Sequence, residues 1–255
     1  MTNFKKYVEK WVPNPSFVFR RGLSGQDGKV GMMVFGESAT PEIYLKIARF
    51  KGPNKSIRRE KEVLEQVRGE TIPKVIFFEE RDGRDVLGLE GKQGFSMLSQ
   101  ILGQEDKRQE QSLKFLEIGF LWLRKFRQTG WAHGDFCPKN LLVADEKLNV
   151  VDWEYAFPEA KPTFDLFYFC LKFGFWLFGQ NKEDGRRYAF RKTFLEDNWL
   201  SKRIKRELEE FKGMKEYFFD SIEFQAKKEE ARTGIKNNFW IDLLDFAKVN
   251  RGRIL

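Results

Sequence analysis

Two short polar segments constrain the fold of this chain more than any other feature. They read Trp131-Ala-His-Gly-Asp-Phe-Cys-Pro-Lys-Asn140 and Val150-Val-Asp-Trp-Glu154. An apolar pair follows the first segment and another opens the second, which predicts a loop that feeds a short strand, a turn and a second strand. Such a hairpin would bring Asp135, Asn140 and Asp152 to the same end.

These three side chains have complementary chemistry. One carboxylate, Asp135, can accept a proton from a hydroxyl group. The amide of Asn140 and the carboxylate of Asp152 offer the oxygen ligands that Mg²⁺ prefers. A base beside a magnesium site is the arrangement that phosphoryl transfer requires. The only histidine of the chain, His133, is expected to brace this loop rather than to act as a base.

Size and composition indicate a globular protein with a large core. The chain has 255 residues, 41% of them apolar, and 27 are Phe,. The longest apolar run, residues 164–178, is interrupted by Asp165 and Lys172, so we expect a buried helix and no membrane span,. No signal peptide is evident. The two cysteines form no metal motif, and a cytoplasmic location is expected,.

The net charge of +8 is unevenly distributed. Residues 1–60 contain 12 Lys and Arg against 5 Asp and Glu, residues 61–180 contain 16 against 19, and residues 181–255 contain 18 against 14. A basic first segment suits a polyanion such as a nucleoside triphosphate, although a solvated basic face explains the excess equally well. No nucleic-acid-binding pattern is present, so no nucleic-acid partner is expected.

The first 90 residues predict a small antiparallel sheet with one helix inserted after the third strand. A glycine-rich connection, residues 22–29, joins the first two strands as a hairpin. The predicted strands are Phe17–Arg21, Gly31–Phe35, Ile43–Ala48, Val75–Phe78 and Asp85–Glu90, and the helix is Ile57–Val67,.

The rest of the chain is expected to be mostly helical after a glycine-rich connection at residues 91–94. Apolar residues recur at helical spacing over Glu110–Thr129, and Gly130 is placed as the stop of that helix,. Aromatic clusters continue the helical pattern from Phe164, and a last helix is predicted over Phe239–Val249. We therefore divide the chain into residues 1–90 and 91–255.

Further candidates for phosphate binding lie in the first part. Glycines of the connection would let backbone N–H groups approach phosphate oxygens. Lys46, in the middle of the third strand, would contact the α- and β-phosphates, although a strand lysine is usually an edge or snorkelling residue. A carboxylate must hold its flexible stem, and the candidates are Glu60 and Glu62, with Glu60 preferred. Glu154 is either a magnesium or substrate contact or a turn residue.

At these residues the sequence resembles the aminoglycoside phosphotransferase and choline kinase-like family, relatives of protein kinases. The motifs that carry the resemblance are His133-Gly-Asp135 with Asn140 and Val151-Asp-Trp-Glu154. Protein kinases usually have Arg where this chain has Gly134, and that arginine reads a phosphorylated activation segment. Only 13 positions separate Asp152 from Asp165, which leaves no room for such a segment or for a peptide-docking platform.

The resemblance implies an α+β, two-lobed protein kinase-like fold: a small antiparallel β-sheet lobe with one helix that binds ATP, and a larger, mostly α-helical catalytic lobe. Ser24, Gly25 and Gln26 would cover the phosphates, and the connection from Leu89 to Gly91 would hydrogen-bond the adenine. Asp135 would be the base, and Asn140 and Asp152 would hold Mg²⁺.

The expected activity is ATP- and Mg²⁺-dependent phosphorylation of a hydroxyl of a small molecule. Aminoglycosides, amino alcohols and sugars, including precursors of cell-surface glycans, stay open as acceptors, as does the oligomeric state. The alternative is a pseudokinase, a non-catalytic nucleotide-binding module on the same scaffold. A kinase acting on proteins or nucleic acids is disfavoured by the missing activation segment.

Overall fold

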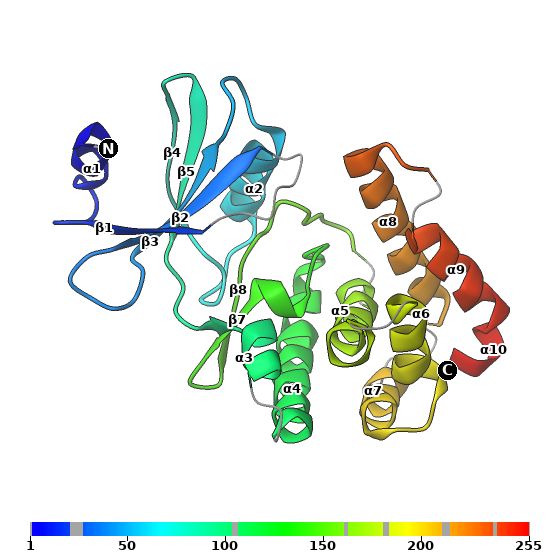
Figure 1. Ribbon diagram of the computed structural model, residues 1–255. Coiled ribbons are helices and arrows are strands. Elements are labelled where there is room, and N and C mark those ends of the chain that lie inside the picture. Colours follow the sequence, from blue (N-terminus) through cyan, green and yellow to red (C-terminus); the bar gives the residue numbers. More distant parts are fainter. Residues whose placement is uncertain are drawn as a thin grey trace. The chain divides into compact units, whose positions relative to one another are not determined.

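The computed structural model describes residues 2–20, 28–103, 107–160, 163–180, 184–210, 215–236 and 239–254. It has an α+β fold, as the sequence predicts, with an antiparallel sheet and many helices (Figure 1). The chain forms two compact units. Unit 1 comprises Met1–Phe95 with Leu142–Ala156, and unit 2 comprises Ser96–Leu141 with Phe157–Leu255.

Unit 1 is built on a five-stranded antiparallel sheet with the strand order β1-β2-β3-β5-β4. The hairpin β1–β2 and the turn at Asp82-Gly83 between β4 and β5 lie where the sequence predicts them. The strands are β1 (Ser16–Arg20), β2 (Lys29–Phe35), β3 (Ile43–Ala48), β4 (Val75–Arg81) and β5 (Arg84–Glu90).

The two faces of this sheet bury different side chains because strand residues alternate between faces. Ile43 and Leu45 of β3 lie on one face, in a core that α1 (Thr2–Val8) completes with Tyr7 and Val8. The opposite face presents Lys46 to α2 (Lys55–Gln66). The sequence predicts α2 but does not anticipate α1, which is seven residues long and too short for a helical period to stand out,.

A second, three-stranded sheet has the order β6-β7-β8, with β6 (Phe95–Ser96), β7 (Leu141–Ala144) and β8 (Lys147–Val150). The predicted hairpin of two short strands corresponds to β7 and β8. Residues 142–156 belong to unit 1, where the backbone N–H of Val150, at the end of β8, donates to the carbonyl of Thr71. Asp152 therefore shares a unit with Lys46.

Unit 2 is helical, as predicted. Its long helix α4 begins at Arg108 and ends at Phe126, and a short 3₁₀ turn carries the chain to Gly130, which ends it in the left-handed region at φ 75°. The helices are α3 (Met97–Gly103), α4 (Arg108–Phe126), α5 (Phe164–Gly174), α6 (Gly185–Phe190), α7 (Trp199–Glu209), α8 (Lys215–Thr233), α9 (Phe239–Val249) and α10 (Arg251–Ile254).

Aromatic rings hold the core of unit 2 together. Phe169 of α5 makes edge-on contacts with Phe120, Phe136 and Phe173. An ion pair between Arg124 and Glu207, at 2.6 Å, joins α4 to α7. Through its contact with Phe169, Phe136 anchors the predicted catalytic segment, residues 131–140, in this core. No helix in the described ranges is long and apolar enough to cross a membrane.

The connection after β5 permits little change in side-chain volume. A Cβ atom on Gly91 would lie 1.9 Å from the carbonyl oxygen of Pro41, which is backbone and cannot move away easily. A Cβ atom on Gly103, at the end of α3, meets no atom within 4 Å. Gly91 is therefore needed for close packing and Gly103 is not.

We expect Gly91→Ala to lower the free energy of unfolding by about 1–3 kcal/mol, the usual cost of overpacking. Gly103→Ala should leave it within about 1 kcal/mol, since alanine is the better helix former. Urea unfolding followed by circular dichroism measures both. Equal effects of the two substitutions would contradict the packing argument.

Candidate functional site

The lysine of β3 is held by two carboxylates inside unit 1. Lys46 Nζ lies 2.5 Å from Glu60 Oε2 on α2 and 2.6 Å from Asp152 Oδ1. Lys46 is 5% exposed and Glu60 is fully buried. Burial lowers the pKa of Lys46, but the charges of Asp152 and Glu60 outweigh this effect and raise it above its ordinary value. The ammonium therefore stays charged and fixed in position.

Glu60, not Glu62, is the partner of Lys46. The side chain of Glu62 is 58% exposed and lies 3.9 Å from Arg59 on the same helix. Glu60 also accepts a hydrogen bond at Oε1 from the backbone N–H of Trp153, at 3.0 Å. One buried carboxylate thus links α2, β3 and the segment after β8.

Asp152 occupies a backbone conformation that few residues adopt. Its φ is 72°, in the left-handed region, where aspartate is tolerated better than bulky or β-branched residues,. The next residue, Trp153, is fully buried. Its ring is held in place by a hydrogen bond of 2.8 Å that Nε1 donates to the carbonyl of Val150. Such outliers persist where the surroundings enforce them and are frequent at functional sites.

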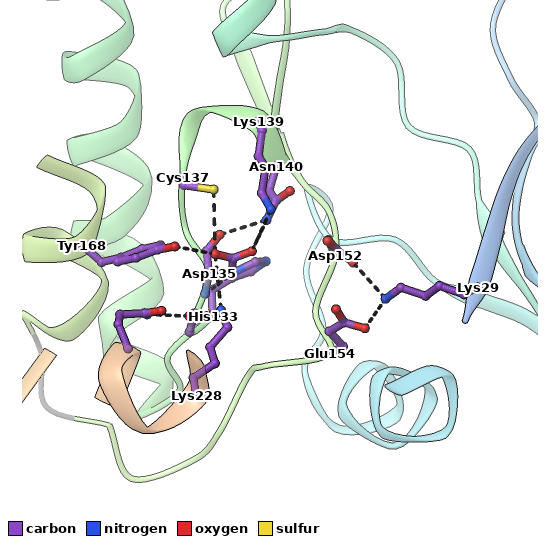
Figure 2. Close-up of polar contacts among 12 residues, drawn as sticks. Lys29, His133, Asp135, Cys137, Lys139, Asn140, Asp152, Glu154, Tyr168 and Lys228 are labelled. Carbon is purple, nitrogen blue, oxygen red and sulfur yellow. Dashed lines mark hydrogen bonds and ion pairs between the residues drawn. The ribbon is translucent and has the colours of Figure 1, made fainter. Parts of the chain in front are cut away.

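A second lysine joins this cluster. Lys29 on β2 pairs with Glu154, and its Nζ lies 3.9 Å from Asp152 Oδ1 (Figure 2). Burial, and then the charge of Asp152, raises the pKa of Glu154. Lys29 was not predicted as a site residue, although the alternation of side chains along a strand could have indicated it. Gly31 pairs with Lys46 across the sheet, and Lys29, two residues earlier, shares that face,.

In unit 2 the carboxylate of Asp165 holds the predicted catalytic segment. It accepts hydrogen bonds from the backbone N–H groups of His133, at 2.6 Å, and Gly134, at 3.0 Å. Gly134 has φ 74°, which glycine adopts without strain,. Burial raises the pKa of Asp165 to about 7, against the lowering effect of these two hydrogen bonds.

His133 is fully buried, and its Nδ1 accepts a hydrogen bond of 3.2 Å from the backbone N–H of Asp135. The acceptor nitrogen faces backbone and not a reacting group. This geometry supports the expected bracing function of the histidine.

Figure 2 shows several polar contacts that converge on the carboxylate of Asp135. Its Oδ1 accepts a hydrogen bond of 2.7 Å from the hydroxyl of Tyr168 and lies 3.4 Å from Lys228 Nζ. Its Oδ2 accepts one of 3.0 Å from Asn140 and lies 3.4 Å from Lys139 Nζ. Burial raises the pKa of Tyr168 well above its ordinary value, so its hydroxyl remains a donor.

Three of these contacts were not assigned from the sequence. Lys139 lies inside the motif but received no function, and Tyr168 and Lys228 come from α5 and α8. Tyr168 follows Asp165 by one helical turn, so the two lie on the same face of α5. Nothing in the sequence indicates that α8 would bring Lys228 to this place.

Asn140 is oriented by Asp135. Its Nδ2 donates to the backbone carbonyl and to Oδ2 of Asp135, both at 3.0 Å. Its carboxamide oxygen Oδ1 accepts no hydrogen bond from the residues that the structure describes. That oxygen is a hard donor of the kind that Mg²⁺ binds, and the carboxylate of Asp152 is another. Asn140 belongs to unit 2 and Asp152 to unit 1.

The remaining predicted residues have different outcomes. Ser24, Gly25 and Gln26 lie outside the described residues. Leu89 is buried in β5 opposite Tyr44. The backbone N–H of Gly91 donates to the carbonyl of Glu42, at 2.8 Å, so any contact of Gly91 with an adenine would have to use its carbonyl oxygen.

Comparison with known proteins addresses the central part of the chain. Residues 90–204 match the model of the family described as the phosphotransferase enzyme family. The resemblance to phosphotransferases is confirmed. The matched span includes Asp135, Asn140, Asp152 and Asp165. Lys29, Lys46 and Glu60 lie before it and Lys228 after it. A search of the curated proteins found no match.

We expect Glu60→Gln to lower the free energy of unfolding by about 2–3 kcal/mol. This is below the usual cost of leaving a buried charge unpaired, because Asp152 still contacts Lys46. Glu62→Gln, at an exposed position on the same helix, should change it by under about 0.5 kcal/mol. Chemical denaturation of wild type, Glu60→Gln and Glu62→Gln measures these free energies. Similar losses of stability in the two variants would exclude a special role for Glu60.

Asp165 also predicts a pH dependence of stability. Its pKa is about 7 in the folded chain against 3.8 ordinarily, so the folded state binds a proton more tightly than the unfolded state. The associated stability is fully present below about pH 4 and is lost as the pH rises through 7, by at most about 1.4 kcal/mol per pH unit. Wild type should lose this stability over pH 4–7, whereas Asp165→Asn should not.

The measurement is the free energy of unfolding at several pH values for wild type, Asp165→Asn and the control Asp197→Asn, whose side chain is 76% exposed. The difference between wild type and Asp165→Asn should shrink from pH 4 to pH 7. A difference that stays constant would show that Asp165 is ionised throughout.

Proposed function

We propose that this phosphotransferase is an ATP- and Mg²⁺-dependent enzyme that phosphorylates a hydroxyl group of a small molecule. The observation that carries the proposal is the carboxylate of Asp135, which Tyr168 and Asn140 orient through separate oxygens. A carboxylate so fixed can accept the proton of an attacking hydroxyl without reorganising. The family match over residues 90–204 supports the reaction class.

Lys46 would bind the phosphates of ATP. Its ammonium is kept charged and immobile by Glu60 and Asp152, so it offers a fixed positive charge to phosphate oxygens,. The glycine-rich connection with Ser24, Gly25 and Gln26 would cover the phosphates through backbone N–H groups, and the segment from Leu89 to Gly91 would bind the adenine.

Asn140 and Asp152 would hold Mg²⁺, through Oδ1 of the amide and through the carboxylate. Bound there, Mg²⁺ would offset the negative charge that develops on the phosphoryl oxygens. Lys29 would position Glu154 and contribute a second positive charge beside Asp152. We place residues 1–90 as the nucleotide-binding part and residues 91–255 as the catalytic and substrate-binding part.

The acceptor is proposed to be a small molecule because only 13 positions separate Asp152 from Asp165. In the structure residues 153–160 and Thr163 lie outside every helix and strand, apart from an isolated bridge at Phe157, and α5 begins at Phe164. A spacing this short leaves little room for a platform that binds an extended peptide. The cytoplasm is the proposed location, in agreement with two free, buried cysteines,.

We expect Asp135→Asn to lower the rate of ATP-dependent phosphorylation by about 10²–10⁴-fold, the usual contribution of a general base. The control is Asp145→Asn, at an exposed turn position with φ 47° that asparagine also adopts,. Phosphorus NMR with Mg·ATP and a panel of hydroxyl compounds measures transfer directly. Equal rates for Asp135→Asn and wild type would remove Asp135 from the reaction.

A thermal-shift measurement separates this proposal from a non-catalytic nucleotide-binding module. Mg·ATP should stabilise the active enzyme, and EDTA should abolish both the shift and the turnover. Stabilisation by nucleotide that does not depend on the metal, without turnover of any acceptor, would favour the non-catalytic module.

A further inference from the structure

Three lysines of unit 2 surround the proposed base: Lys139, Lys172 and Lys228, which we call the lysine cluster. Lys139 and Lys228 lie 3.4 Å from different oxygens of Asp135. Lys228 also lies 3.4 Å from the carbonyl oxygen of Gly134, and its side chain is only 16% exposed. The surroundings of the base are thus strongly cationic.

Lys172 is the most unusual member of the lysine cluster. It follows Tyr168 by four residues on α5, so both side chains lie on the same face of the helix,. Its Nζ lies 5.7–5.9 Å from the ring centres of Tyr168, Phe175 and Trp240. Within the described ranges it has no carboxylate partner and no hydrogen bond. Burial lowers the pKa of this lysine.

Tyr168 connects Lys172 to the base. Its ring lies beneath both Lys172 and Lys228, whose Nζ is 6.0 Å from the ring centre, and its hydroxyl donates to Asp135. The ammonium groups of Lys172 and Lys228 therefore both face the ring of Tyr168. The hydroxyl of this ring lies at Asp135, where the acceptor hydroxyl would react. Lys172 and Lys228 adjoin the acceptor end of the proposed site.

Among the described residues, the carboxylates near these cations are already engaged. Asp135 is shared between Lys139 and Lys228. Asp165 is committed to two backbone N–H groups, and its pKa of about 7 leaves it only partly charged near neutral pH. Arg186 adds a further cation close to Lys172, partly offset by Glu229. Lys172 is only partly exposed and has no carboxylate in ion-pair contact among the described residues. An ammonium group in such surroundings is unfavourable, and a bound anion would relieve this cost.

We propose that the acceptor of this phosphotransferase carries a carboxylate or phosphate group, which Lys172 and Lys228 bind beside Asp135. The aromatic rings around Lys172 limit its exposure to solvent, so an ion pair there is stronger than at a fully exposed surface,. The same positive charge repels polycationic acceptors. This inference rests on the proposed phosphotransfer function and narrows its acceptor to anionic hydroxyl compounds.

The test uses four small hydroxyl compounds that differ in charge: D-glycerate, glycerol 3-phosphate, glycerol and choline. The full chain is saturated with Mg²⁺ and a non-hydrolysable ATP analogue, so that the nucleotide site is filled. Acetylation of lysines is then quantified by mass spectrometry with and without each compound. Glycerate and glycerol 3-phosphate distinguish a carboxylate site from a phosphate site.

At least one of the two anions should protect Lys172 and Lys228 from acetylation, whereas glycerol and choline should not. Lys172→Gln should weaken binding of that anion about tenfold or more, as expected for loss of a charged hydrogen-bond partner, and Lys172→Arg should retain it. The control Lys125→Gln, at an exposed position on α4, should bind as wild type does. Binding of the nucleotide analogue should be unchanged in all three variants.

Absence of protection by both anions, or protection by choline, would overturn the anionic acceptor. Protection of Lys172 by the Mg²⁺-bound analogue alone would also overturn it, because the lysine cluster would then serve the nucleotide phosphates. Failure of the analogue to bind at all would instead overturn the proposed phosphotransfer function, and with it the acceptor role of the cluster. Footprinting of wild type decides these points even where a variant folds poorly.

Discussion

The buried ammonium of Lys46 is the group on which unit 1 depends. It is compensated from two directions, by Glu60 of α2 and by Asp152 after β8. Because an unpaired buried charge is costly, α2 and the segment after β8 are both held to the sheet at this point. The hydrogen bond from Trp153 to Glu60 reinforces the same junction. The same set of contacts holds unit 1 together and fixes the positive charge that we propose binds phosphates.

Unit 2 also contains a buried ionisable group, here a carboxyl group and not an ammonium group. The buried carboxylate of Asp165 is satisfied by two backbone N–H groups, which fixes the path of the loop through His133 and Gly134. Asp135 is then presented at a defined position, where Tyr168 and Asn140 direct its two oxygens. The proposed base is thus oriented by neutral donors, while the lysine cluster sets the electrostatic character of its surroundings.

Strong local patterns made much of the fold predictable. The strand and helix bounds around Lys46 follow from alternation and helical period, and Ile43–Ala48 and Phe239–Val249 agree residue for residue. The packing of residues 142–156 with unit 1 was not predictable, because it depends on long-range contacts such as Val150 with Thr71. The helix α1 was missed because one or two turns carry too little periodicity.

The sequence alone indicated the phosphotransferase class, because Asp135, Asn140 and Asp152 lie close together along the chain in a recognisable order. It also pointed to Lys46 and Glu60, and the structure joins them in a buried ion pair. Only the tertiary structure brought Lys29 to Glu154 and Lys228 to Asp135, pairs that are 125 and 93 residues apart. No local pattern encodes such pairs, since folding alone decides which distant surfaces meet. For that reason the charge around the proposed acceptor site, and with it the inferred acceptor class, came from the structure.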